Sequence, residues 1–170
     1  AAPGDIALRV FGLWHGSVVE GPGRRSVVQT SGCSLRCPGC IAEEAWDPRA
    51  GRPLGIAAVA TALLDPVGAP RDGVTVLGGE PFEQPEALAA LLAELRLRAP
   101  GLHLTVYSGY TLAALARRPE PAVRRALDLA DLLIDGPFVR RLAAGAGEWR
   151  GSRNQRLIPH PGRLLAARGR

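Results

Sequence analysis

The chain has 170 residues, a net charge of +5 at pH 7 and a sequence pI of about 10.0. Hydrophobic residues make up 46% of it, enough for one domain with a real core. All of its basic residues are arginines scattered in pairs, which argues against a nucleic-acid surface and leaves an acidic protein partner open. With no signal peptide and no membrane-length apolar stretch in view, a cytoplasmic protein without membrane contact is expected.

In chain order, the first half of the sequence predicts two strands, a turn-rich segment, a helix and a third strand. These lie at residues 5–11, 25–30, 47–55, 56–64 and 73–77. The strands are short and rich in Val and Ile, as buried strands are. Asp65-Pro66 is expected to end the helix, and Gly78-Gly79 to end the third strand.

The second half predicts a helix, a strand, two helices and a last strand. These lie at residues 85–98, 102–107, 112–117, 121–129 and 131–134. The first of these helices is the clearest, because Pro85 suits a first turn and Glu86 lies at the positive end of the helix dipole. Thr111 can cap the next helix. From Gly145 on, the tail (145–170) is predicted to be loop-rich, with a short strand at 156–158.

The alternation of strands and helices is typical of an α/β fold in which helices cover parallel strands. One domain, residues 1–170, is expected. The chain is too short for a complete eight-fold barrel, which needs ~250 residues. An open doubly wound sheet and a partial barrel both fit the predicted order.

Four of the predicted strands are followed by small, polar or glycine-containing turns. The turns are Ser31-Gly32-Cys33, Gly78-Gly79-Glu80, Ser108-Gly109-Tyr110 and Asp135-Gly136-Pro137. The carboxyl ends of parallel strands meet at one rim, where ligands bind, so these turns are expected to converge on one site. Their glycines would let backbone N–H groups approach a charged ligand closely.

All three cysteines, Cys33, Cys37 and Cys40, lie within eight residues directly after the second strand. Thiolates this close favour zinc, Cu(I) or an iron–sulfur cluster. A [4Fe–4S] cluster normally takes four cysteines, so three would leave one iron with an open coordination position. A zinc site completed by a distant histidine, or three thiols without a metal, are the alternatives.

Further motifs follow in a fixed order around these cysteines. They are GPGR at 21–24, GCSLRCPGC at 32–40, Trp46, GGEPF at 78–82, YSGYT at 107–111, DGPF at 135–138, WRGS at 149–152 and NQR at 154–156. The set resembles the radical S-adenosylmethionine (SAM) superfamily, and more closely the activating enzymes of anaerobic ribonucleotide reductase. The resemblance covers residues 16 to 158, and its strength lies in the order of motifs that are each weak alone.

The resemblance implies a partial (βα) barrel of radical SAM type, with a [4Fe–4S] cluster on Cys33, Cys37 and Cys40. SAM would bind the fourth iron, and one electron would cleave it to methionine and a 5′-deoxyadenosyl radical that takes a hydrogen atom from the substrate. The implied substrate is a backbone glycine of a glycyl-radical enzyme such as anaerobic ribonucleotide reductase. Flavodoxin or ferredoxin is the expected electron donor.

The resemblance also implies which residues bind SAM: Gly78, Gly79, Glu80, Ser108, Thr111, Asn154 and Gln155. Backbone carbonyls of the first turn, or the Glu80 carboxylate, would accept hydrogen bonds from the SAM amino group. Ser108 and Thr111 would reach the ribose or the methionyl carboxylate, with helix capping as the alternative. Asn154 and Gln155 would close over SAM or place the polypeptide substrate.

The chain departs from related activases directly after its third cysteine. They often carry His or Phe and then Asn there, whereas this sequence has Ile41-Ala42. Two other functions therefore stay open. One is a radical SAM enzyme that acts on a peptide or small molecule, and the other is a non-enzymatic module that binds zinc or an iron–sulfur cluster.

Overall fold

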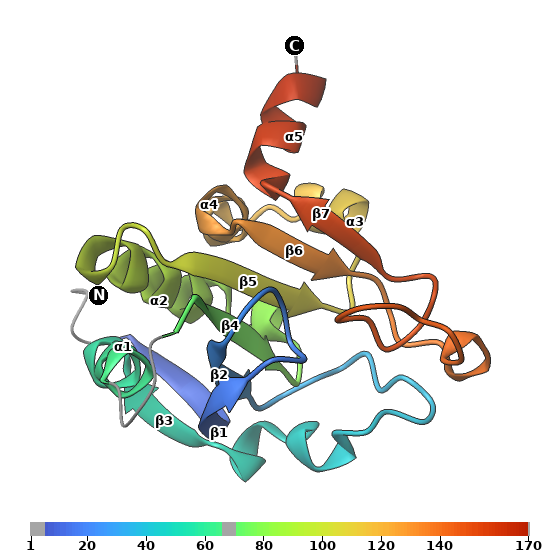
Figure 1. Ribbon diagram of the computed structural model, residues 1–170, viewed down its shortest axis with the longest axis horizontal. Coiled ribbons are helices and arrows are strands. Elements are labelled where there is room, and N and C mark those ends of the chain that lie inside the picture. The colour runs from blue at the N-terminus through green and yellow to red at the C-terminus, as the bar shows by residue number, and fades with distance from the viewer. Residues whose placement is uncertain (1–5, 66–70, 170) are drawn as a thin grey trace.

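A mixed seven-stranded sheet forms the centre of the computed structural model, which describes residues 6–65 and 71–169. The strand order is β3-β1-β2-β4-β5-β6-β7 (Figure 1). The strands are β1 (Ala7–Ser17), β2 (Arg25–Thr30), β3 (Arg52–Gly55), β4 (Gly73–Gly78), β5 (His103–Ser108), β6 (Leu132–Asp135) and β7 (Arg156–Pro159). Neighbours within β2-β4-β5-β6 are parallel, whereas β1, β3 and β7 pair antiparallel.

Helices connect the parallel strands β4, β5 and β6, in the manner expected of an α/β chain, and one helix also follows each of β3 and β7. They are α1 (Ile56–Leu64), α2 (Pro85–Arg98), α3 (Leu112–Ala116), α4 (Pro121–Leu129) and α5 (Pro161–Arg168). Single 3₁₀ turns lie at η2 (Glu43–Ala45), η3 (Pro48–Ala50), η4 (Pro81–Glu83) and η5 (Arg140–Leu142). None of the helices in the described part of the chain is long and apolar enough to cross a membrane.

The hydrophobic core lies between one face of the sheet and the helices. Alternate strand residues such as Val76 and Val106 pack there with helix residues such as Leu88 and Leu92. Loops cover the opposite face instead (Figure 1). The hydroxyl of Thr75 donates to the carbonyl of Glu20 in the β1–β2 connection, over a distance of 2.6 Å. One face of the sheet therefore packs against the helices and forms the hydrophobic core, and the other face is covered by loops.

Arg25 fastens the β1–β2 connection to the sheet. Its fully buried guanidinium donates to the hydroxyl of Thr75 and to the carbonyls of Pro22 and Val74, at 2.7 to 2.8 Å. A Cβ on Gly73 would lie only 2.4 Å from its Nη1, so this strand start needs glycine. Burial lowers the pKa of Arg25 to about 10. This arginine explains the Gly-Pro-Gly-Arg-Arg stretch, in which the sequence alone gave Arg25 no role.

Most predicted elements are confirmed. β2, α1, α2 and α4 have the predicted bounds, and Asp65 follows the end of α1; the other strands and α3 differ at their ends. Of the predicted positions, Asp5 and Pro66 lie outside the described residues. Parallel pairing is confirmed for four strands only, because β1 runs opposite to both of its neighbours, β2 and β3, and β7 follows β6 without a crossover helix.

Two predictions were wrong. The segment 47–55, predicted as turns, contains β3, which carries a proline and exists because it pairs with β1. The tail was predicted to be loop-rich apart from a short strand at 156–158; β7 confirms that strand, but the unpredicted helix α5 follows it. This helix begins at Pro161, after His160 adopts a left-handed conformation with φ of 46°. Both elements depend on tertiary partners, β3 on β1 and α5 on α4, so local propensity did not reveal them.

Candidate active site

The four predicted turns do converge, and backbone hydrogen bonds link them in strand order. The N–H of Glu80 donates to the carbonyl of Gly32 at 2.9 Å, joining the β4 turn to the β2 turn. The N–H of Gly109 donates to the Glu80 carboxylate at 2.7 Å, joining β4 to β5. The N–H of Gly136 donates to the carbonyl of Tyr110 at 3.2 Å, joining β5 to β6. The carboxyl ends of the parallel strands therefore form one continuous rim.

Glu80 links neighbouring turns of this rim through its side chain. Its side chain is buried, and its carboxylate accepts hydrogen bonds from the N–H of Phe82, the hydroxyl of Ser108 and the N–H of Gly109. These donors are all neutral, and burial dominates, raising the pKa of Glu80 to about 7. The carboxylate thus holds the β5 turn against the β4 turn.

The start of the cysteine loop is held by two backbone hydrogen bonds. The N–H of Cys33 donates to the carbonyl of Trp46 at 3.0 Å, and the N–H of Ser34 donates to Glu83 at 2.6 Å. A Cβ on Gly79 would lie 2.8 Å from the carbonyl oxygens of Thr30 and Gly32. Glycine at position 79 therefore lets the β4 turn lie directly against the start of the cysteine loop.

The three thiols are free and half-buried on this loop. Burial raises the pKa of the Cys33 thiol, and the backbone N–H groups of Arg36 and Leu35 act against that rise. Within residues 6–65 and 71–169, no three Cys, His, Asp or Glu side chains converge on a point as a single ion requires. Three thiols on one loop are a donor set that suits an iron–sulfur cluster, whose ligands bind separate irons.

Ser108 and Thr111 both hydrogen-bond within the protein. Ser108 is buried, donates to Glu80 and accepts from the N–H of Tyr110 at 3.0 Å. Thr111 caps α3 as predicted, accepting from the N–H of Ala114 at 3.2 Å, and its side chain is exposed at the rim. Of the two hydroxyls, that of Thr111 is the more accessible to a ligand.

Asn154 and Gln155 reach the β6 turn from the tail. The Asn154 amide donates to the carbonyl of Pro137 at 2.7 Å, and the Gln155 amide donates to that of Gly136 at 3.0 Å. The side-chain oxygen of Gln155 accepts from the N–H groups of Gly151 and Ser152. The side-chain oxygen of Asn154 is buried without a partner among the described residues, so it is an acceptor available to a ligand.

Trp149 fixes the tail segment over the loop-covered face of the sheet. Its carbonyl accepts a hydrogen bond of 2.5 Å from the hydroxyl of Tyr107 on β5. Its own backbone has φ of 61°, an unusual conformation for a bulky residue. The hydrogen bond to Tyr107 therefore holds the segment around Trp149 in a backbone conformation that a loop without such a contact rarely adopts.

Some contacts at the site had no signal in the sequence. A Cβ on Gly109 would lie 2.4 Å from Leu35, so the cysteine loop packs on the β5 turn. Glu83 holds Ser34 although Glu83 lies outside all of the motifs. Ile41, where the resemblance led us to expect a departure from related activases, is 95% exposed and therefore lies on the outer surface of the loop.

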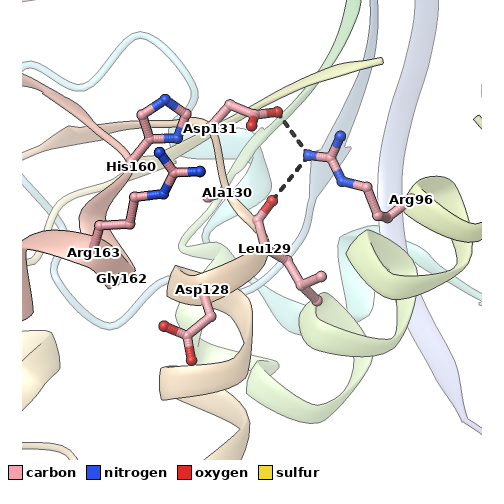
Figure 2. A pocket seen from close by; sticks show the side chains of 8 residues that line it. All are labelled: Arg96, Asp128, Leu129, Ala130, Asp131, His160, Gly162 and Arg163. Carbon is pink, nitrogen blue, oxygen red and sulfur yellow. Dashed lines mark hydrogen bonds and ion pairs between the residues drawn. The ribbon is translucent and has the colours of Figure 1, made fainter. Parts of the chain in front are cut away.

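A polar cavity of about 230 Å³ lies away from this rim, beside the amino end of β6 (Figure 2). Arg96 crosses it to pair with Asp131 at 2.7 Å and donates to the carbonyl of Leu129. Asp128, below, pairs with Arg124 at 2.9 Å. Ion pairs thus neutralise its carboxylates, and it contains none of the predicted site residues.

Comparison with known proteins agrees with this geometry. Residues 19–158 match the family described as a 4Fe-4S single cluster domain. The anaerobic ribonucleoside-triphosphate reductase-activating protein of Escherichia coli K12 is 32% identical over 142 residues, 81% of this chain and 90% of that protein. Its counterpart in Salmonella typhimurium is 33% identical over 152 residues, 87% of this chain and 96% of that protein.

A solved structure supports the fold alone. QueE from Escherichia coli aligns with a TM-score of 0.53 at 14% identity, covering 78% of this chain and 72% of that one. Two findings show the family. Most of the chain matches the cluster-domain family, and two relatives are more than 30% identical to it over most of its length. The chain belongs to the 4Fe-4S single cluster domain family and, with these relatives, to the anaerobic ribonucleoside-triphosphate reductase-activating proteins.

Proposed function

We propose that this chain is a radical SAM enzyme that generates a glycyl radical on an anaerobic ribonucleoside-triphosphate reductase. One observation carries the proposal. Three free thiols lie on a loop that is hydrogen-bonded to the Gly78-Gly79-Glu80 turn of the next parallel strand. The relatives are anaerobic ribonucleoside-triphosphate reductase-activating proteins, which supports this reductase as the target.

Cys33, Cys37 and Cys40 hold the [4Fe–4S] cluster through their thiolates. No fourth cysteine exists in the chain, so one iron remains for SAM. The four parallel strands, with helices on one face and loops on the other, are proposed to form a partial barrel around this site. Residues 1–170 act as one radical SAM domain in this proposal.

The SAM-binding residues divide into contacts and supports. Gly78 and Gly79 offer backbone groups beside the cysteine loop, Thr111 offers an exposed hydroxyl, and Asn154 offers a free acceptor. Glu80, Ser108 and Gln155 instead hold the rim turns in place, because their polar side-chain atoms already form hydrogen bonds with those turns. Gly78 and Gly79 supply acceptors for the SAM amino group, since an ammonium has only donors.

The two cofactors supply the radical chemistry: one electron cleaves SAM to methionine and a 5′-deoxyadenosyl radical, which takes a hydrogen atom from the target glycine. The protein orients SAM at the rim and keeps water from it. Tyr107 and the Trp149 segment shield the loop-covered face beside the rim. Partners are the glycyl-radical enzyme and, as electron donor, flavodoxin or ferredoxin.

The test is anaerobic reconstitution followed by metal analysis and reduction with dithionite. We expect four irons and four sulfides per chain, release of 5′-deoxyadenosine from SAM, and a glycyl-radical EPR signal when the reductase is added. A reconstituted four-iron protein that cleaves no SAM would contradict the proposal. Cleavage of SAM without any radical on the reductase would instead favour a peptide or small-molecule substrate.

A further inference from the structure

The segment between the first two thiols contains a residue in an unusual backbone conformation. Arg36 has φ of 48°, in the left-handed region that glycine adopts readily and other residues rarely do. For a residue with a Cβ, this conformation lowers the population by about tenfold. Among the residues other than glycine in the described part of the chain, Trp149 and His160 alone share it. A contact with the surrounding structure must therefore hold Arg36 in place.

The contact is with the indole ring of Trp46. The guanidinium of Arg36 lies over this ring, 5.5 Å from its centroid, which is within the range of a cation–π interaction. The backbone of the same tryptophan also holds the loop, because its carbonyl accepts the N–H of Cys33 at 3.0 Å. Trp46 thus fastens both ends of the segment 33–36, which leads directly to Cys37.

The two residues inside this segment are anchored as well. The N–H and the hydroxyl of Ser34 donate to the carboxylate of Glu83, at 2.6 and 2.5 Å. Leu35 packs on the β5 turn, where a Cβ on Gly109 would lie 2.4 Å from its Cδ1. Each of the four residues of the segment 33–36 therefore has a contact outside it, and together these contacts fix its path.

The path of this segment directs backbone N–H groups at a cysteine sulfur. Those of Leu35 and Arg36 act on the Cys33 sulfur and oppose the rise in its pKa that burial causes. Further along the loop, the N–H of Ala42 donates to the Cys40 sulfur at 3.4 Å. Such N–H groups stabilise negative charge, and an iron–sulfur cluster gains one negative charge when it is reduced. The conformation of Arg36 therefore affects how easily the cluster accepts an electron.

We propose that Arg36 and Trp46 are positioning residues, which keep the backbone N–H groups of Leu35 and Arg36 on the Cys33 sulfur and so favour reduction of the cluster. The inference rests on the proposed function, because it assumes a cluster at the three cysteines. Arg36 acts through its backbone and not through its charge: the contact with Trp46 offsets the unfavourable φ, and the backbone N–H groups act on the sulfur. Without that contact, the segment relaxes and these N–H groups turn away from the sulfur.

The test compares Arg36→Ala with Arg36→Gly. Both variants lose the guanidinium, but glycine adopts a positive φ readily whereas alanine does not. Each protein is reconstituted with its cluster and titrated potentiometrically, while EPR follows the reduced cluster. At the wild-type midpoint potential, the ratio of reduced to oxidised cluster should fall about fivefold in Arg36→Ala. In Arg36→Gly it should stay within about twofold of wild type, because the backbone conformation is kept.

The ring is tested separately from the arginine. Trp46→Leu keeps the guanidinium but should lower the same ratio about threefold, and Trp46→Phe, which keeps an aromatic ring, should restore most of it. In the cluster-free chain, the amides of residues 33–37 should exchange hydrogen about threefold faster in Trp46→Leu than in wild type. Arg49→Ala is the matched control, because this exposed arginine pairs with Asp47, the residue after Trp46, and it should change neither quantity.

Two results would overturn this role of Arg36 and Trp46. The first is an equal midpoint potential in Arg36→Ala and Arg36→Gly, whether both shift because the charge acts directly or neither shifts. The second is an unchanged potential and unchanged hydrogen exchange in Trp46→Leu. If the wild-type four-iron protein cleaves no SAM, the proposed function fails instead, and the potentials and the exchange rates still decide the role of the two residues.

Discussion

Two buried or half-buried carboxylates, Glu80 at the rim and Asp131 at the remote cavity, have opposite electrostatic environments. Glu80 accepts from two backbone N–H groups and one hydroxyl, and burial raises its pKa to about 7. Burial also acts to raise the pKa of Asp131, but the N–H of Leu104 and the guanidinium of Arg96 outweigh it and lower that pKa. The positive charge of Arg96 thus stabilises the ionised form of Asp131 enough to overcome burial, whereas the neutral hydrogen-bond donors around Glu80 do not.

The polar cavity and the rim therefore differ in what their polar groups do: those at the cavity mainly stabilise the fold, and those at the rim can bind ligands. At the cavity, the carboxylates of Asp128 and Asp131 are both paired with arginines, so these carboxylates join neighbouring elements instead of facing a ligand. At the rim, the three thiols form no disulfide, and the side-chain oxygen of Asn154 has no hydrogen-bond partner among the described residues. Groups left without partners are available to cofactors and to other proteins.

The largest expected effect comes from removing a rim thiol. Cys37→Ala should abolish the four-iron cluster and reduce SAM cleavage by more than about 100-fold, because the cluster loses one of its three ligands. The free energy of unfolding of the cluster-free chain should change by less than about 0.5 kcal/mol, since the thiol is half-buried and forms no disulfide. Iron and sulfide analysis with urea unfolding checks both. A full cluster in this variant would refute the assignment of Cys37.

The second effect is a pH dependence that Glu80 imposes on stability. Burial raises its pKa from 4.5 to about 7, so the folded chain holds this proton more tightly than the unfolded chain does. Its contribution to stability is fully present below pH 4.5 and is lost as the pH rises through 7, by roughly 3 kcal/mol in all. Urea unfolding of the cluster-free chain between pH 5 and 8 measures it.

Glu80→Gln is the matched control for this titration. It keeps the shape of the side chain but cannot ionise, so the difference in pH slope between wild type and variant isolates Glu80 from the histidines. We expect the variant to show a flatter curve. Parallel curves for the two proteins would mean that Glu80 titrates at its ordinary pKa in the folded chain.

The third effect breaks the charge pairing at the cavity. Arg96→Ala removes the 2.7 Å ion pair with Asp131 and three donations to backbone carbonyls. Because both side chains are partly exposed, we expect a loss of only about 1–2 kcal/mol in the free energy of unfolding. The Kd for SAM should be unchanged in the reconstituted enzyme, as measured by equilibrium dialysis. A changed Kd would show that the two ends of the sheet are coupled.

The smallest effect concerns the cap of α3. Thr111→Ala should cost about 1 kcal/mol, because the N–H of Ala114 loses its side-chain acceptor. If Thr111 also contacts SAM, the Kd for SAM rises as well, and Thr111→Ser should restore both quantities. A destabilised variant with an unchanged Kd would leave Thr111 as a cap only.

Local signals explain which elements could be predicted. Pro85 at the start of α2 and the arginines near its end lie within one helix, so the sequence reveals its bounds. β3 offers no such signal, since Arg52 and Pro53 are poor strand residues and the strand exists through its register with β1. The same holds for the site. The rim turns were predictable because they directly follow the strands, whereas the hydrogen bond from Ser34 to Glu83 joins distant parts of the chain and was not predictable.

The sequence by itself determined the element order, the thiol spacing and the residue types at the rim, because each is written within a short stretch of chain. Only the tertiary structure decided that Glu80 braces the rim and that Arg140 lies on Gly39 between two thiols. Both depend on contacts between segments far apart in the chain. Burial, and with it the energetics of a charge, is set by those contacts and not by the neighbours of a residue in sequence.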